Sequence, residues 1–187
     1  WTRGPSDLDG QSFAARGPNG LLPDLWIPLL GEHQVLNAVT ALAALSLLPG
    51  VDLPPAALRR GLAQVRWPAR LEILARRPLL VVDSAHNGDS AEKLVAALHA
   101  CCVYDRLIVV LGSSADHVTP GLLRTLLAEA SLAIATRSRH PRAADPTWLR
   151  ERAAELGIEV EVISTVADAL DRALALAAPD DLVCCTG

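Results

Sequence analysis

From residue 71 onward, short apolar runs alternate with segments of helical spacing, and this alternation restricts the fold more than any other feature of the chain. The expected strands, such as RLIVVL and DLVCC, are nearly continuous in Val, Ile, Leu and Cys. Such runs are typical of parallel strands in a sheet that helices cover on both faces. The pattern therefore predicts an α/β domain with a Rossmann-like, mostly parallel sheet. We expect strands within 71–83 and at 106–111, 132–136, 158–163 and 181–185, and helices at 89–101, 119–130, 146–156 and 166–177.

The first 66 residues follow a different pattern. Strand-like runs at 11–16 and 24–29 flank the turn signal Gly17-Pro18-Asn19-Gly20, which together predict a β-hairpin. Apolar residues then recur at helical spacing over 33–48, and Pro54-Pro55 marks the start of a second helix. We therefore expect two domains, residues 1–66 and residues 67–187.

The composition of the chain argues against nucleic-acid and membrane partners and indicates the cellular compartment. A net charge of -4 provides no basic surface for nucleic acid, and no apolar run reaches the roughly 18 residues that a membrane span needs. The four cysteines form two adjacent pairs, a spacing that suits neither a zinc knuckle nor a disulfide framework, so we expect reduced thiols and a cytoplasmic protein. The chain opens on Trp1 and contains no methionine, which indicates a piece of a longer protein.

One cluster of candidate functional residues follows the apolar run that ends at Val82. Asp83 and His86 stand where the expected strand ends, and ligands of open α/β sheets bind beyond the carboxyl ends of the strands. Asp89 and Glu92 have the spacing of a capping box, which would start a helix there and leave residues 84–88 as an exposed loop. In the alternative interpretation, Asp83 only caps and His86 is an ordinary loop residue.

Two further candidates lie upstream. His33 and Asn37 are four residues apart and share one helix face, where an amide can pair with a purine edge; either residue could instead be a helix cap. Arg70, in WPARLE, could bind a phosphate bidentately or be an ordinary surface arginine. The single lysine, Lys93, lies in AEKL, so the chain contains no G-x-x-x-x-G-K-[ST] phosphate loop.

Taken together, these motifs resemble a known family. H-Q-x-x-N-A-x-x-A at 33–41, W-x-x-R-x-E at 67–72 and D-x-A-H-N at 83–87, in this order, resemble the C-terminal portion of folylpolyglutamate synthases and their bifunctional dihydrofolate synthase relatives in the Mur ligase superfamily. LGSSADH at 111–117, TRSRHPRA at 136–143 and the final LVCCTG are looser matches to later segments of that family.

The resemblance implies an ATP-dependent ligase that adds L-glutamate to folate or dihydropteroate through an acyl phosphate, with ATP and Mg²⁺ as cofactors, acting as a monomer. Residues 1–66 would end the ATP-binding domain and 67–187 would form the C-terminal ligase domain. The phosphate loop and the magnesium ligands would precede Trp1, so the chain alone is expected to be inactive. The roles that the resemblance implies are catalysis by Arg70 and His86, ATP binding by His33, Asn37, Arg70, Asp83 and His86, and substrate binding by His86, Asn87 and Asp116.

Departures from the family pattern leave alternatives open. Ala69 and Ser84 stand where the family has glycine, and His117 and Val118 stand where it has a lysine and a second acid. Another Mur-type amide ligase, or a degenerate module that binds a nucleotide or a protein partner without catalysis, fits these departures. A dinucleotide-binding oxidoreductase would need G-x-G-x-x-G after the first strand, where this chain has SAHNGD.

Overall fold

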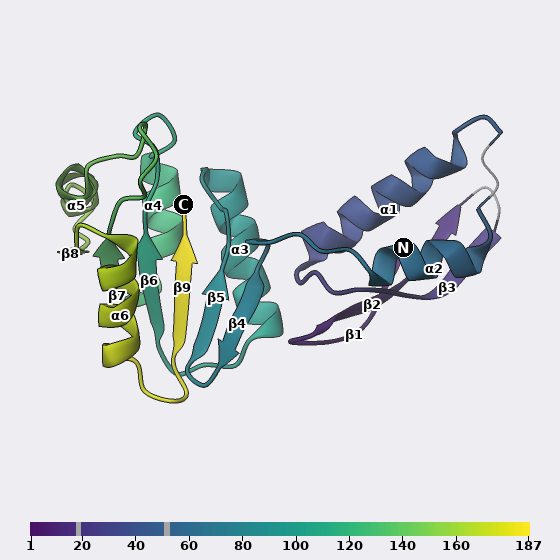
Figure 1. Ribbon diagram of the computed structural model, residues 1–187, viewed down its shortest axis with the longest axis horizontal. Coiled ribbons are helices and arrows are strands. Elements are labelled where there is room, and N and C mark those ends of the chain that lie inside the picture. The colour runs from purple at the N-terminus through teal and green to yellow at the C-terminus, as the bar shows by residue number, and fades with distance from the viewer. Residues whose placement is uncertain (18–19, 51–52) are drawn as a thin grey trace. The chain divides into compact units, whose positions relative to one another are not determined.

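The computed structural model describes residues 1–17, 20–50 and 53–187, and the chain divides into two compact units (Figure 1). Unit 1 consists of residues 1–70 with 97–102, and unit 2 consists of residues 71–96 with 103–187. No helix among the described residues is long and apolar enough to cross a membrane.

Unit 1 is a three-stranded antiparallel sheet with two helices. Its elements are β1 (Thr2–Asp7), β2 (Gly10–Gly17), β3 (Gly20–Ile27), α1 (Glu32–Ser46) and α2 (Pro55–Ala63), and the strand order is β1-β2-β3. The expected hairpin and both helices are confirmed, although Pro18 and Asn19 of the turn lie outside the described residues. Strand β1 was not predicted, because TRGPSD has no apolar alternation and is almost wholly exposed.

The core of unit 1 forms where one face of the sheet meets α1. Phe13, Leu25 and Ile27 are buried against Val35 and Ala38 of the helix. The buried side chain of Gln11 donates from Nε2 to the carbonyl oxygens of Leu29 (2.6 Å) and Gly31 (2.8 Å), so it fixes the backbone that leads into α1.

Unit 2 is a six-stranded sheet with helices on both faces, as the alternating pattern predicts (Figure 1). Its strands are β4 (Glu72–Arg76), β5 (Leu79–Val82), β6 (Leu107–Leu111), β7 (Ala130–Ala135), β8 (Glu161–Val162) and β9 (Leu182–Thr186). Its helices are α3 (Gly88–Cys101), whose last turn falls in unit 1, α4 (Pro120–Leu127), α5 (Pro146–Ala154) and α6 (Val166–Leu176). Only β4 runs antiparallel to its neighbour. The strand expected at 158–163 shortens to two residues at the edge of the sheet.

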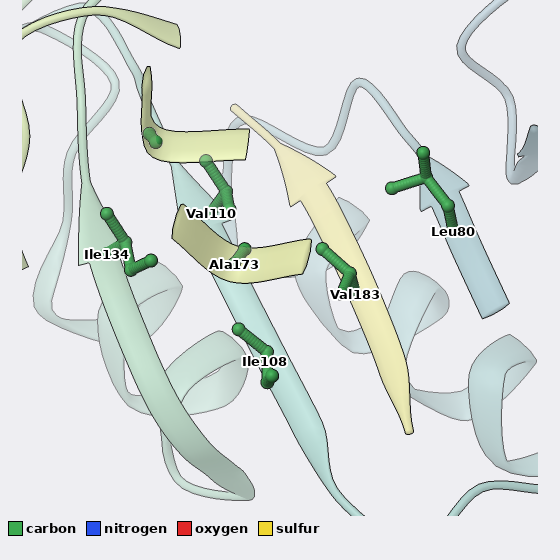
Figure 2. Packing of buried hydrophobic residues seen from close by; sticks show 7 residues of the cluster. Leu80, Ile108, Val110, Ile134, Ala173 and Val183 are labelled. Atoms are coloured by element: carbon green, nitrogen blue, oxygen red, sulfur yellow. The ribbon is translucent and has the colours of Figure 1, made fainter. Parts of the chain in front are cut away.

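Alternating residues of the strands form the core beneath α6 (Figure 2). Ile108, Val110, Ile134 and Val183 point to the same face of the sheet, where Ala173 of α6 meets them. All five side chains are buried, and the methyl side chain of Ala173 leaves the helix close to the strands.

The strand order determines where a ligand site can form. The sheet runs β4-β5-β9-β6-β7-β8, so the last strand of the chain is inserted between β5 and β6. The carboxyl ends of β5, β9, β6 and β7 therefore meet along one edge of the sheet, and the loops that follow them converge there.

Candidate functional site

A cleft of about 380 Å³ opens at this edge of unit 2. Every residue that lines it belongs to a segment following the carboxyl end of a parallel strand, and most are polar: Ser84, His86, Gly112, Ser113, Ser114, His117, Ser138, His140, Arg142, Ala143 and Gly187. Three imidazoles, one guanidinium and several hydroxyls make this cleft a place for a polar, anionic ligand.

Two glycines bring bare backbone into the cleft. Gly187 has φ +129, and a Cβ there would lie 1.5 Å from the carbonyl oxygen of Gly112. The Gly112 N–H donates to the carbonyl of Thr186 at 3.1 Å, which continues the pairing of β6 with β9 beyond the strands. Only glycine fits at position 187, because both its φ and its contact with Gly112 exclude a side chain.

His86 is held in a defined tautomer by the loop after β5. Its Nδ1 lies 2.9 Å from the carbonyl oxygen of Ser84, which can only accept a hydrogen bond. Nδ1 therefore carries the proton in the neutral ring, and Nε2 keeps a lone pair. His86 is exposed at the cleft, so this lone pair can accept a proton or a hydrogen bond from a ligand.

The loop that carries His86 ends in a helix cap other than the one expected. The Asn87 side-chain oxygen accepts from the Ser90 N–H at 2.9 Å, while the Ser90 hydroxyl accepts from the N–H groups of His86 and Asn87. Asp89 instead pairs with Lys93 at 2.6 Å along the surface of α3. The helix consequently begins at Gly88, two residues before Ser90, which would be the first helical residue after a cap at Asp89.

His117 packs next to His86 in the cleft. The two ring centroids are 5.1 Å apart and the ring planes are tilted by 45°. His117 Nδ1 lies 3.1 Å from the Ser114 hydroxyl, and its N–H donates to the Ser114 carbonyl at 3.0 Å. This turn sets the orientation of the ring that stands beside His86.

Asp116 is an acidic residue next to two residues that line the cleft, His117 and Arg142. Hydrogen bonds from the Ser114 hydroxyl and from its own N–H, together with the charges of His117 and Arg142, lower the pKa of the Asp116 carboxyl. Arg142 Nη1 lies 3.7 Å from Asp116 Oδ2, and both side chains are more than half exposed. This exposed pair is weak, so a ligand carboxylate or phosphate can compete with Asp116 for Arg142.

The loops after β6 and β7 are bonded to each other beneath the cleft. The Ala144 N–H donates to the Ser113 carbonyl at 2.7 Å, and Ser114 pairs with Ala143 in an isolated bridge. Two hydroxyls in this region, those of Ser113 and Thr136, are buried and have no hydrogen-bond partner among the described residues. Ser113 lines the cleft, although its hydroxyl oxygen is itself buried.

Both carboxylate oxygens of Asp83 accept hydrogen bonds from backbone N–H groups. Oδ2 accepts from the Leu71 N–H and Oδ1 accepts from the Ala85 N–H, each at 2.8 Å. Its own N–H donates to the carbonyl of Cys185 in β9 at 2.9 Å. The carboxylate therefore ties the first residue of unit 2 to the loop that carries His86.

Arg70 lies between two residues of left-handed backbone. Ala69 has φ 56 and Leu71 has φ 47, a region in which a non-glycine residue costs roughly 1–2 kcal/mol. The guanidinium carbon of Arg70 lies 5.5 Å from the centroid of the Trp67 ring, a cation–π contact within unit 1.

His33 and Asn37 belong to a polar chain along the first turns of α1. The Asn37 amide donates to Gln34 Oε1 at 3.2 Å, and Gln34 Nε2 lies 3.1 Å from His33 Nε2. Gln34, which sequence reasoning named only as part of the motif, is the residue that joins them. These residues belong to unit 1, as Arg70 does.

Of the residues expected from the sequence, His86 lines the cleft in unit 2 and Asp116 pairs with the lining residue Arg142. Asp83 is bonded to backbone nearby, and Asn87 caps α3. Sequence reasoning did not assign His117, Arg142 or Ser113 to the site. The only signals were the departure at His117 and the position of Arg142 in the segment 136–143.

The fold and the cleft together define an α/β domain with a polar cleft at the carboxyl edge of a mostly parallel sheet. Residues 69–187 match the family model described as Mur ligase, glutamate ligase domain, and the chain belongs to that family.

Known proteins also match the part of the chain that precedes residue 69. A dihydrofolate synthase/folylpolyglutamate synthase of Mycobacterium tuberculosis is 34% identical over 175 residues, which are 90% of this chain and 36% of that protein. The structure of a folylpolyglutamate synthase of Mycobacterium tuberculosis complexed with ADP and AMPPCP superposes with a TM-score of 0.92 at 33% identity, covering 100% of this chain and 44% of that one. A bifunctional folylpolyglutamate synthase/dihydrofolate synthase with Mn, AMPPNP and L-glutamate bound gives a TM-score of 0.77 at 28% identity, covering 90% of this chain and 39% of that one. The chain thus spans less than half the length of these relatives.

Proposed function

We propose that the chain is part of an ATP-dependent carboxylate–amine ligase that adds L-glutamate to folate or dihydropteroate. The observation that carries this proposal is the match over the whole chain to a folylpolyglutamate synthase, combined with a cleft rich in anion-binding groups in unit 2. Another Mur-type amide ligase shares the same family, so the acceptor is the part of the proposal that most needs a direct test.

Residues 1–66 are proposed to end the ATP-binding domain of this ligase, and residues 67–187 to form its C-terminal domain. The surface of α1 supports the first assignment, because no charged residue occurs from Val35 to Leu48. Leu36 is 53% exposed and Leu47 is 78% exposed on a helix whose other face is already buried in unit 1. An apolar helix face of this kind is typical of a surface that the rest of its domain covers.

ATP and a divalent metal ion are proposed cofactors, because relatives bind ADP, AMPPCP or AMPPNP and, in one case, Mn. Asn37, with His33, is proposed to contact the adenine. Arg70 and His86 are proposed to contact the phosphates, and Asp83 the ribose or phosphate region. Among the described residues, no group of three His, Cys, Asp or Glu side chains could hold a metal ion. The metal ligands are therefore proposed to lie in other parts of the ligase.

The chemistry of the cleft follows from its donors and acceptors. In the proposed reaction, the glutamate amine attacks the acyl phosphate, a C–N bond forms, the C–O bond to phosphate breaks, and the ammonium proton must leave. The Nε2 lone pair of His86 can accept a hydrogen bond or the proton from that amine. Arg142 can bind a carboxylate of glutamate, and Asn87 and Asp116 are proposed further contacts.

An ADP-release assay on the full-length ligase tests the proposal, with folate, dihydropteroate and a UDP-linked muramyl acceptor offered in turn. We expect ADP release to require L-glutamate and one of the two pteroate-type acceptors. Arg70→Ala and His86→Ala should each lower kcat/KM on the order of 100-fold, the usual effect of removing one group that stabilises charge in the transition state. Arg152→Ala is the matched control, because it removes an exposed ion pair with Glu155 and a cation–π contact with Trp148 outside the cleft, and it should leave kcat/KM unchanged.

Three results would contradict the proposal. ADP release with the muramyl acceptor alone would assign the chain to another Mur-type ligase. No ADP release with any acceptor, while ADP still binds, would leave a binding module without catalysis. Unchanged kinetics in Arg70→Ala and His86→Ala would remove those side chains from the reaction.

A further inference from the structure

The surroundings of His117 leave one of its ring nitrogens open. The Ser114 hydroxyl donates to the Asp116 carboxyl, so its oxygen is the acceptor for His117 Nδ1, which lies 3.1 Å away. Nδ1 therefore carries the proton of the neutral ring. Nε2 lies 3.9 Å from Asp116 Oδ2, which is longer than a hydrogen bond, and it has no hydrogen bond to any other described residue. Because His117 lines the cleft, a proton or a ligand can reach this nitrogen.

Charged and titratable groups from three loops face the His117 ring. Asp116, on the same loop after β6, favours the protonated ring because it is an acid. His86, from the loop after β5, has its ring centroid 5.1 Å away, and His140 and Arg142 line the same cleft from the loop after β7. Arg142 is positively charged and each imidazole becomes so on protonation, so these three groups oppose a charge on His117. A negative charge that a ligand adds to the cleft therefore favours protonation of this ring.

The loop that carries His117 is held by contacts that do not involve the charge of its ring. The His117 N–H donates to the Ser114 carbonyl at 3.0 Å. Val118, which follows it, packs against a cluster of buried apolar residues, and Thr119 caps α4. The ring can therefore gain or lose a proton while its loop keeps these contacts.

We propose that His117 is a binding residue whose charge depends on its ligand: an anionic oxygen group of a substrate binds at Nε2, and the ring takes up one proton from solvent as it binds. This inference rests on the proposed function for the identity of the substrates. The family resemblance implies a lysine at this position, and a lysine stays charged near neutral pH, whereas an imidazole changes its charge between about pH 5 and about pH 8. Binding at this position should consequently weaken as the pH rises.

The open nitrogen is tested on the 187-residue chain itself, without catalysis. Where the ring is neutral, nitrogen NMR spectra should place the proton of His117 on Nδ1 and leave Nε2 bare. His86 should show the same tautomer, because its Nδ1 faces the carbonyl of Ser84, and it serves as the internal reference. Inorganic phosphate or L-glutamate, added at constant pH and ionic strength, should move the His117 signals toward those of a protonated ring.

The dependence on charge is tested in the full-length ligase by comparing the unsubstituted protein with His117→Lys, which keeps a cation throughout the assay range. From about pH 6 to about pH 8, the ratio of the unsubstituted KM to the variant KM should rise about fivefold for one substrate, the upper end for an exposed charge pair. The ratio cancels the titration of the substrates, of His86 and of His140, which both proteins share. A rise for L-glutamate assigns a carboxylate to His117, and a rise for ATP assigns a phosphate.

Two further variants control this comparison. His99→Lys makes the same substitution at an exposed position of α3 that does not line the cleft, and its KM ratio should not change with pH. His117→Asn cannot take up a proton, so its KM should match that of the unsubstituted protein at the higher pH and exceed it at the lower pH.

The failure of this proposal is distinguishable from failure of the proposed function. A ring proton on Nε2 of neutral His117, or no response of the ring to either anion, would overturn the proposal whatever the enzyme does. KM ratios that stay constant with pH for both substrates, in His117→Lys and in His117→Asn, would overturn it and leave the ligase activity intact. A full-length protein without glutamate-dependent ADP release would contradict the proposed function, while the NMR results on the chain would still decide whether His117 takes up a proton with an anion.

Discussion

Two buried threonines at the carboxyl edge of the sheet should respond in opposite directions to the same substitution. Thr186 is 8% exposed and donates its hydroxyl to the carbonyl of Ala85 at 3.2 Å, whereas the hydroxyl of Thr136, which is 2% exposed, has no partner among the described residues. Valine preserves the shape of threonine and removes only the hydroxyl, so the substitution opens no cavity. The two substitutions therefore measure how much a buried hydroxyl contributes to the free energy of unfolding, once with a hydrogen-bond partner and once without.

The magnitudes follow from these contacts. Thr186→Val removes the donor of a buried carbonyl and should lower the free energy of unfolding of unit 2 by about 1–2 kcal/mol. Thr136→Val removes a hydroxyl that is buried without compensation, and should raise that free energy by about 1 kcal/mol. The two variants should thus differ by about 2–3 kcal/mol, which exceeds the error of a denaturation experiment.

Urea titration followed through the backbone amide signals of β6 and β9 measures the unfolding of unit 2 separately from that of unit 1. Separation matters because two compact units need not unfold in one transition. If Thr136→Val destabilised unit 2 as much as Thr186→Val does, the Thr136 hydroxyl would have a partner such as a bound water, and the reasoning would be refuted. If Thr186→Val and the unsubstituted chain were equally stable, the hydrogen bond from Thr186 to Ala85 would not contribute to the free energy of unfolding.

Three further predictions concern other buried positions of the chain. Ala173→Leu should destabilise unit 2 by about 1–3 kcal/mol, because the added carbons meet the packed strands beneath α6, whereas Ala175→Leu on the exposed side should be near neutral in the same urea titration. The Arg106 guanidinium and the Ala178 N–H lower the pKa of the buried Asp181, so this carboxylate stabilises the fold above its unfolded pKa and that stabilisation is lost as the pH falls through its lower folded pKa. Arg106→Met should accordingly move acid unfolding, followed by circular dichroism, to higher pH; an unchanged midpoint would argue against the pairing. Burial, and secondarily Cys101, raises the pKa of Cys102 from 9.0 to about 11, so iodoacetamide at pH 8 should modify it about 100-fold more slowly than the unfolded chain, as judged by mass spectrometry.

The sequence was sufficient to predict the elements whose patterns are local. The strands β6 and β9 are continuous apolar runs, and α4 begins at a proline with Thr119 as its cap, so each element is encoded within its own residues. β1 was missed because its pairing with β2 depends on backbone hydrogen bonds alone, which leave no hydrophobic pattern in TRGPSD. The cap of α3 was misassigned because Asn87 and Asp89 both suit a cap, and only the bond from Ser90 to Asn87 distinguishes them.

The composition of the cleft could be predicted only in part. His86 follows an apolar run directly, so its place at a strand end is a local property of the sequence. Arg142 and Gly187 reach the same cleft because β9 is inserted between β5 and β6, which brings Thr186 to Ala85 across 101 positions of sequence. No periodicity or spacing within either segment encodes that order of strands, and the side chains that complete the cleft therefore emerge only from the fold.

Ala69 has a backbone conformation that explains why the family has glycine at this position. The family resemblance implies glycine where this chain has Ala69, and the observed φ of 56 is a conformation that glycine adopts without the penalty of a Cβ. Alanine therefore retains the backbone of a glycine position and stores strain directly beside Arg70. Leu71, on the other side, shares the left-handed conformation and is bonded to Asp83. Because an alanine in this region has fewer alternative conformations than glycine, the residue that strains the segment also restricts where Arg70 can project.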